Sequence, residues 1–331
     1  MPGLGRTRYG PGTDSLTDRY CKFWLAVHKE ARKIRPDARI IAGAYSFCRR
    51  PPLQTRLNDK ILIGVVPALY YPWSDENVEQ IHNVWKGWGR TGAQLYMRPN
   101  FFHFGHNLSV NISRKFGEFF SYAFTHNMTV TDFDQRPAPW ASQGPALYVQ
   151  GRMHRHGDWP VDKVLDEYYV GFGCAEAEVR AYFAHWEQVT YSDLIEKAYR
   201  AGWKSPLVIP PITDNHEHRL YRWSELFITD DDLAKGRTLL EKARQAAKGD
   251  ATATERTEFL DMGLRDYELT RATSIAFRAY KQGGDIGPYA VALKALDDHR
   301  AAIDQYNVAD MAYLRWKEFL WNRAILDKVS D

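Results

Sequence analysis

The run Ile61-Leu-Ile-Gly-Val-Val66 is short and apolar, and aromatic side chains follow it within a few residues. A run of this length is typical of a buried strand. Three further runs of the same kind lie at residues 38–44, 93–97 and 128–131. The four runs recur about every 30 residues, which is the length of one βα unit. The pattern therefore predicts parallel strands that alternate with helices.

Helical periodicity fills the segments between these runs. Apolar residues at helical spacing predict a first helix that begins near Ser15, a second over residues 75–88 and a third near 108–125. The first helix is expected to end at Arg35-Pro36, because the residue before a proline is pushed out of the α region. After the fourth run the pattern is helical almost throughout.

Two domains are predicted from this organisation. Residues 1–200 are expected to form an α/β, TIM-barrel-like (β/α) domain, and residues 201–331 an α-helical domain. Beyond Thr229 the spacing predicts three or four amphipathic helices, with turns at Gly249-Asp250 and Gly283-Gly284.

Four βα units are too few to close a barrel, which takes eight parallel strands. The chain is therefore expected to form only the carboxyl-terminal half of a barrel. Two alternatives stay open at this point: an open α/β sheet, and closure by pairing with a second copy of the chain. The helical tail offers a surface for such a homodimer.

Bulk composition disfavours several classes of protein. The 44 basic and 41 acidic residues give a net charge of +3, and no long block of one sign occurs, so nucleic acid is not an expected partner. No apolar stretch reaches the roughly 18 residues of a membrane span, and a membrane is not an expected partner either. The three cysteines show no CxxC spacing, which argues against a zinc knuckle or a disulfide framework.

The start of the chain and its aromatic residues are the remaining compositional signals. Residues 1–12 are rich in Gly and Arg and lack the apolar region of a signal peptide, so the localisation is unknown from the residues alone.

Aromatic residues make up 14% of the chain, with 11 Trp and 19 Tyr. They predict either an aromatic-rich core or a saccharide site, because sugars bind by stacking on aromatic faces.

Functional-looking side chains gather after each predicted strand. Enzymes with parallel sheets build their sites at the carboxyl ends of the strands. The candidate substrate-binding residues at these positions are Tyr45, Tyr70, Tyr71, Trp73, Arg98, Asn100, His103 and His106. Core packing is the alternative role for at least one of the aromatic residues.

Asp132 and Asp134 follow the fourth run and are the candidate catalytic residues. Side chains two apart on a strand point the same way, so both carboxylates are expected to face the cleft. Glycoside hydrolysis needs one carboxylic acid and a second carboxylate or an acetamido group of the substrate. The alternatives are that either aspartate caps the next element or pairs with Arg136, and that Arg98 neutralises Asp132 instead of binding an acidic sugar.

Trp140 and Gln143 lie just beyond and complete the list of candidate binding residues. An indole can form the floor under a sugar ring, and an amide can hold a hydroxyl or acetamido group. Trp140 can equally serve as a plug in a loop.

Histidine pairs at 103 and 106, 154 and 156, and 216 and 218 suggest a metal. Zinc sites need three or four convergent ligands, and no pair comes with an obvious third. We expect neither a metal nor another cofactor.

Several of these segments together carry a family resemblance, which covers about residues 14–186. They are Ser15-Leu-Thr-Asp-Arg-Tyr20, Pro36-Asp37-Ala38, Ala44-Tyr45-Ser46 with Arg50-Pro51-Pro52, Arg98-Pro99-Asn100, Thr131-Asp132-Phe133-Asp134, and Trp140-Ala141-Ser142-Gln143-Gly144-Pro145 with the helix Leu147 to Arg152. The chain resembles the second half of the DUF4838 family of glycosidase-like (β/α)8-barrel proteins. That family is related to glycoside hydrolase family 163, which comprises endo-β-N-acetylglucosaminidases.

The resemblance implies a saccharide substrate, a cleft on the strand-end loops and possible export. It also implies four further barrel strands upstream of the matched part. The resulting hypothesis is a glycoside hydrolase-like protein that cleaves a glycosidic bond in an N-acetylglucosamine- or uronic-acid-containing oligo- or polysaccharide. The alternative is a non-catalytic carbohydrate-binding protein or a truncated barrel fragment.

Overall fold

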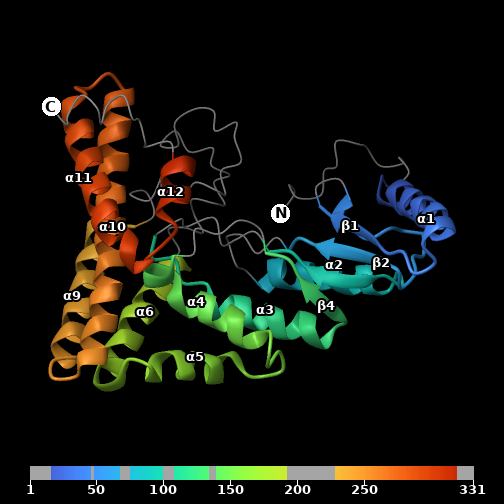
Figure 1. Ribbon diagram of the computed structural model, residues 1–331, viewed down its shortest axis with the longest axis horizontal. Helices are drawn as coiled ribbons and strands as arrows, with labels where there is room; N and C mark the ends of the chain where they lie inside the picture. The colour runs from blue at the N-terminus through green and yellow to red at the C-terminus, as the bar shows by residue number, and fades with distance from the viewer. Residues whose placement is uncertain are drawn as a thin grey trace. The chain divides into compact units, whose positions relative to one another are not determined.

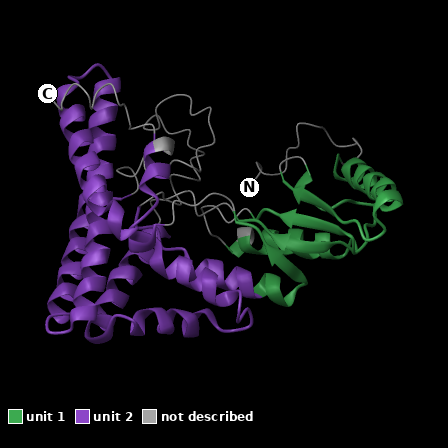
Figure 2. Ribbon diagram, viewed as in Figure 1, with its two compact units in different colours: residues 1–100, 122–134 green, residues 101–121, 135–331 purple. Residues whose placement is uncertain are grey.

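The computed structural model describes residues 16–45, 48–67, 75–99, 108–133, 139–191 and 228–318. The chain divides into two compact units (Figure 2). The sheet unit comprises residues 1–100 and 122–134, and the helical unit comprises residues 101–121 and 135–331. The domain boundary predicted near residue 200 lies outside the described residues.

The sheet unit contains four parallel strands in the order β1-β2-β3-β4 (Figure 1). They are β1 (Ile40–Ala44), β2 (Ile61–Val65), β3 (Gln94–Met97) and β4 (Met128–Thr131). The predicted α/β class and all four predicted strands are thereby confirmed. Within the described residues β1 and β4 are the edges of this sheet.

Helix α2 (Asp75–Gly89) packs against β3 on one face of the sheet (Figure 1). Trp85 and Trp88 of α2 are fully buried, and Leu95 of β3 lies against Gly89. Because successive side chains of a strand point to opposite faces, Tyr96 belongs to the other face, which we call the open face.

Helix α1 (Leu16–Ile34) ends where the proline at position 36 predicts. It buries Thr17, Asp18, Cys21 and His28, whereas Tyr20, Phe23, Val27 and Ile34 are exposed. These four apolar residues therefore lie on the surface of the described structure, whereas Trp24 of the same helix packs against the buried Trp88. The reason is that the helix contacts β1 and β2 through a narrower face, in which the His28 ring hydrogen-bonds to the carbonyl of Ala38.

Asp18 ties α1 to the following loop. Its carboxylate accepts hydrogen bonds from the backbone N–H groups of Leu53, Gln54 and Thr55 at 2.8, 3.0 and 2.7 Å. Burial by itself would raise the pKa of Asp18, but hydrogen bonds from Thr55 and the two preceding backbone groups lower it below its usual value.

The helical unit begins with part of α3 (Ser113–Thr125), whose last residues belong to the sheet unit. Its other helices are α4 (Trp140–Met153), α5 (Val161–Val170), α6 (Glu176–Thr190), α9 (Asp230–Ala246), α10 (Ala251–Lys281), α11 (Gly287–Ile303) and α12 (Met311–Lys317). The helices predicted beyond Thr229 are confirmed. Gly249 and Gly283 have positive φ angles of 93° and 95°, as the predicted turns require.

Helix α10 packs between α9 and α11 and reaches α4 (Figure 1). Inside this bundle the guanidinium of Arg300 donates to the carboxylates of Asp266 and Glu318 and to the hydroxyl of Thr270. Arg300 and Asp266 are fully buried, so this polar network joins α10, α11 and the end of α12.

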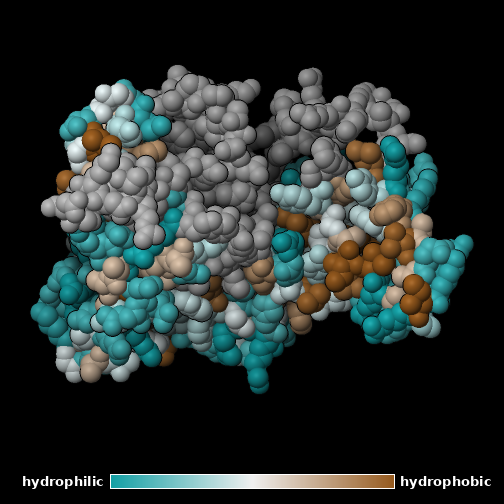
Figure 3. Space-filling view, turned by 45° about the horizontal axis from the view of Figure 1, so that its top comes forward, coloured by the Kyte–Doolittle hydropathy of each residue, from teal (hydrophilic) through white to brown (hydrophobic). Residues whose placement is uncertain are grey.

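Apolar surface gathers on part of the sheet unit (Figure 3). On the open face and edges of the sheet, Ile41 is 71% exposed and Val130 is 49% exposed. Among the described residues, no helix combines the length and apolarity needed to cross a bilayer.

Candidate functional site

The carboxyl ends of the four strands lie together at one end of the sheet, because the strands are parallel. We call this end the carboxyl edge, as distinct from the outer strands β1 and β4. Three predicted site residues are described at this edge: Tyr45 after β1, Arg98 after β3 and Asp132 after β4. Seven others lie outside the described residues: Tyr70, Tyr71, Trp73, Asn100, His103, His106 and Asp134.

Arg98 and Asp132 form an ion pair in which the Arg98 guanidinium donates to the Asp132 carboxylate. The backbone N–H of Asp132 donates to the carbonyl of Met97 at 2.9 Å, and that of Arg98 donates to the carbonyl of Val65 at 3.0 Å. These bonds extend the strand pairing by one residue and tie both residues to the backbone of the sheet. The two side chains are 36% and 51% exposed, so the pair is accessible to a ligand.

Tyr96 precedes Arg98 on the open face, and its ring lies directly over Gly64 of the neighbouring strand. Burial and the negative charge of Asp132 raise the pKa of Tyr96, and the positive charge of Arg98 partly offsets them. Sequence reasoning missed this tyrosine because it falls within a strand. Gly64 could have indicated its position, since a glycine inside a strand often marks the close approach of another group.

The exposed carboxylate and guanidinium at this edge can hydrogen-bond to hydroxyl groups or to an acidic group of a ligand, whereas the Tyr96 phenol is buried beside them. Two residues on one face of adjacent strands also hold one another in place, which preorganises them for a ligand. The described part of the edge supplies one carboxylate, whereas glycoside hydrolysis uses two groups.

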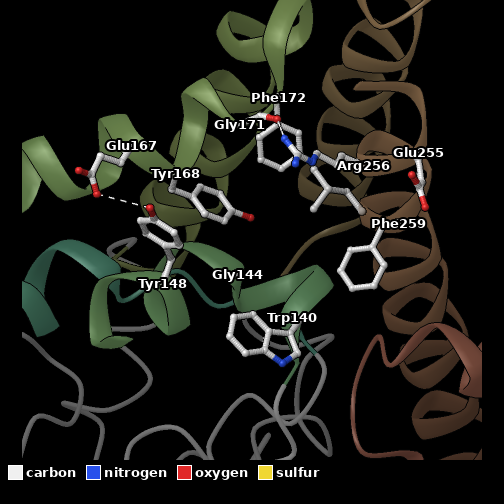
Figure 4. Close-up of a pocket in the computed structure, with 11 residues that line it drawn as sticks. Trp140, Gly144, Tyr148, Glu167, Tyr168, Gly171, Phe172, Glu255, Arg256 and Phe259 are labelled. Carbon is white, nitrogen blue, oxygen red and sulfur yellow. Dashed lines mark hydrogen bonds between the residues drawn. The ribbon is translucent and has the colours of Figure 1, made fainter. Parts of the chain in front are cut away.

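Trp140 and Gln143 belong to the helical unit and have different surroundings. Trp140 begins α4 and lines a pocket of about 600 Å3 (Figure 4). Gln143 is buried, has non-helical backbone angles, and donates from its amide to the carbonyl of Leu108 at 3.2 Å. Gln143 therefore contributes to the packing beneath the first turn of α4, a role that its spacing in the sequence did not indicate.

The pocket of Trp140 joins segments far apart in the chain. Its lining comes from α4, from α5 and the turn after it, and from α10: Trp140, Gly144, Tyr148, Glu167, Tyr168, Gly171, Phe172, Glu255, Arg256, Phe259 and Leu260. Sequence reasoning identified only Trp140 among these residues.

Within the part of the chain that the structure describes, no three His, Cys, Asp or Glu side chains are grouped so that they could hold a metal ion.

Comparison with known proteins identifies a family. No curated protein and no solved structure matches the chain. The model of DUF4838, a domain of unknown function, matches residues 7–184, which cover the whole sheet, α4, α5 and most of α6. Because this match spans more than half of the sequence, the chain belongs to the DUF4838 family.

Proposed function

We propose that this protein is glycoside hydrolase-like and acts on an N-acetylglucosamine- or uronic-acid-containing glycan at the carboxyl edge of its parallel sheet. The observation that carries the proposal is the accessible Arg98–Asp132 pair at the ends of two adjacent parallel strands. The carboxyl ends of parallel strands are where (β/α) enzymes bind substrate.

We further propose that the sheet is half of a (β/α)8 barrel. Parallel sheets are normally covered on both faces, yet Ile41 on β1 is largely exposed and Val130 on β4 is half exposed. The apolar residues Tyr20, Phe23 and Val27 of α1 are exposed as well. Additional βα units at these two edges would bury all three surfaces.

The ion pair bears on the chemistry that Asp132 can perform. The Arg98 guanidinium holds the Asp132 carboxylate in a fixed, half-exposed position. Asp132 therefore suits the role of nucleophile, of general base, or of a group that stabilises developing positive charge on the substrate. The general acid would then be another group. Asp134 is the candidate that the sequence offers for this role.

Saccharide binding without turnover is the second candidate function. The same ion pair favours this function. A carboxylate that is paired with arginine can accept hydrogen bonds from sugar hydroxyls without taking part in a reaction. Hydrolysis and simple binding both require that the saccharide binds, so only the release of product distinguishes them.

The test is to measure binding and product release on a panel of N-glycans and glucuronoxylan oligosaccharides, comparing Asp132→Asn and Asp134→Asn with the parent chain. Asp37→Asn is the matched control, because Asp37 also pairs with an arginine, Arg35, but precedes β1 at the opposite end of the sheet. If Asp132→Asn or Asp134→Asn abolishes product release but still binds the glycan, hydrolysis is supported. Binding without release in the parent chain supports the second function, and absence of both contradicts the proposal.

A further inference from the structure

We propose that the pocket formed by α4, α5 and α10 is a separate saccharide site that takes an uncharged sugar unit, such as an N-acetylhexosamine. The choice of a saccharide as ligand rests on the proposed function. The site itself rests on its own geometry and lies wholly within the helical unit.

Aromatic rings form the walls of this pocket. Figure 4 shows Trp140, Tyr168 and Phe259 around the same space, with Tyr148 on one side of Tyr168 and Phe172 on the other. Its volume of about 600 Å3 falls within the range of small-ligand sites, roughly 300–1,000 Å3. Flat apolar rings with polar groups beside them match a pyranose, which has an apolar face of C–H bonds and a rim of hydroxyls.

The rings are held in place before any ligand arrives. Tyr168 makes edge contacts with Phe172 at 5.5 Å and with Phe183 at 5.9 Å between ring centroids, and it lies 5.6 Å from Tyr148. Its hydroxyl lies against Gly144, where a side chain would displace the ring. A wall fixed in this way loses little conformational entropy on binding.

Trp140 is positioned by the residue that follows it. Ala141 is buried in a cluster with Ile303, Val308 and Leu314, and it packs against Gly263 of α10. The indole of Trp140 itself is 46% exposed. The helix start is thus anchored to α10 while the ring stays available as a stacking surface.

Polar groups surround the aromatic walls. The Arg256 guanidinium donates to the carbonyl of Gly171 at the end of α5, which fixes that side chain across the pocket. Glu167 accepts two hydrogen bonds from Arg152 at 2.7 and 3.0 Å, and one from the Tyr148 hydroxyl at 3.4 Å. Hydrogen bonding to Arg152 is the largest influence on the pKa of Glu167 and lowers it.

The charges of these groups balance and favour a neutral ligand. Glu167 is neutralised by Arg152, and the positive Arg256 stands next to the negative Glu255 in the lining. A free carboxylate on the ligand would gain from Arg256 but be repelled by Glu255. An N-acetylated sugar can accept and donate hydrogen bonds there without this repulsion.

The experiment is isothermal titration calorimetry of the whole chain with N,N′-diacetylchitobiose, and with an aldotetraouronic acid as the acidic comparison. Trp140→Ala should weaken chitobiose binding about tenfold or more, as expected when an aromatic anchor is truncated. Trp140→Phe should recover most of the binding, because it keeps an aromatic face. Tyr306→Ala is the matched control, since Tyr306 is 52% exposed in the same unit and does not line the pocket.

Asp132→Asn distinguishes this inference from the proposed function. If Trp140→Ala loses chitobiose binding while Asp132→Asn and Tyr306→Ala retain it, the pocket is the site. If Asp132→Asn loses binding and Trp140→Ala retains it, the pocket inference is wrong and the strand-end proposal stands. If the parent chain binds the acidic sugar more tightly through Trp140, or binds neither probe, the assignment of a neutral sugar is overturned.

Discussion

The ring of Tyr96 lies directly over Gly64 on the open face of the sheet, with its phenol against the position that a Cβ atom would occupy. The two residues are paired in the register of β2 and β3. Gly64 thus provides the space in which Tyr96 lies beside Arg98 and Asp132.

Gly64→Ala should therefore displace Tyr96 and destabilise the chain by about 1–3 kcal/mol, the usual cost of overpacking a closed site. The measurement is urea denaturation followed by circular dichroism. Gly43→Ala is the matched control, because Gly43 is the register partner of Gly64 on β1 and a Cβ there meets nothing within 4 Å. Equal effects of the two substitutions would contradict the role given to Gly64.

Gly263→Ala should destabilise the helical unit even though alanine is the better helix former. A Cβ at position 263 would lie 2.5 Å from the Cβ of Ala141, so α4 and α10 would have to separate. We expect a net loss of about 1–3 kcal/mol, measured by thermal unfolding.

Gly151→Ala in α4 is the control for helix propensity, because a Cβ at that position meets nothing within 4 Å. It should stabilise the chain by up to about 1 kcal/mol. A stabilising Gly263→Ala would show that α4 and α10 do not pack as described.

Arg300→Met should be among the most damaging substitutions in the helical unit. It leaves the buried carboxylates of Asp266 and Glu318 without their cation, and breaking a buried pair in this way costs about 3–5 kcal/mol. The midpoint of urea unfolding reports this loss.

Arg244→Met tests whether the loss comes from burial. Arg244 pairs with Glu241 on the exposed side of α9, so its removal should change stability by no more than about 1 kcal/mol. The triple substitution of Arg300, Asp266 and Glu318 by apolar residues should recover much of the stability lost in Arg300→Met, because no unpaired charge is then buried.

Stability should fall as the pH drops below the unfolded-state histidine pKa of about 6.5. Burial lowers the pKa of His185, whose Nε2 lies 2.8 Å from the carbonyl of Asp232, and burial also lowers the pKa of His82. The unfolded chain therefore binds protons more readily than the folded chain in this range, and the loss levels off below the folded-state pKa values.

The check is to compare urea midpoints at pH 7.5 and 5.5 for the parent chain and for His185→Gln. The glutamine variant should show a smaller difference between the two pH values. An unchanged difference would mean that His185 does not titrate as its burial indicates.

Local patterns in the sequence determined the secondary structure. The apolar runs became β1 to β4, Pro36 ended α1, and Gly249 and Gly283 formed the turns between the long helices. These signals act within a few residues, through side-chain periodicity and backbone sterics. The same reasoning indicated that Arg98 and Asp132 follow adjacent strands, and pairing between them was one of the two roles considered.

Only the tertiary structure decided which groups meet across long stretches of chain. The pocket brings Trp140 and Tyr168 together with Arg256 and Phe259, although α4 and α10 are about a hundred residues apart in sequence. The burial of Gln143 and the position of Tyr96 over Gly64 likewise depend on close packing between elements, which periodicity does not encode. A pattern repeated along one helix or strand identifies its apolar face, but the partner of that face is set by the packing of the whole unit.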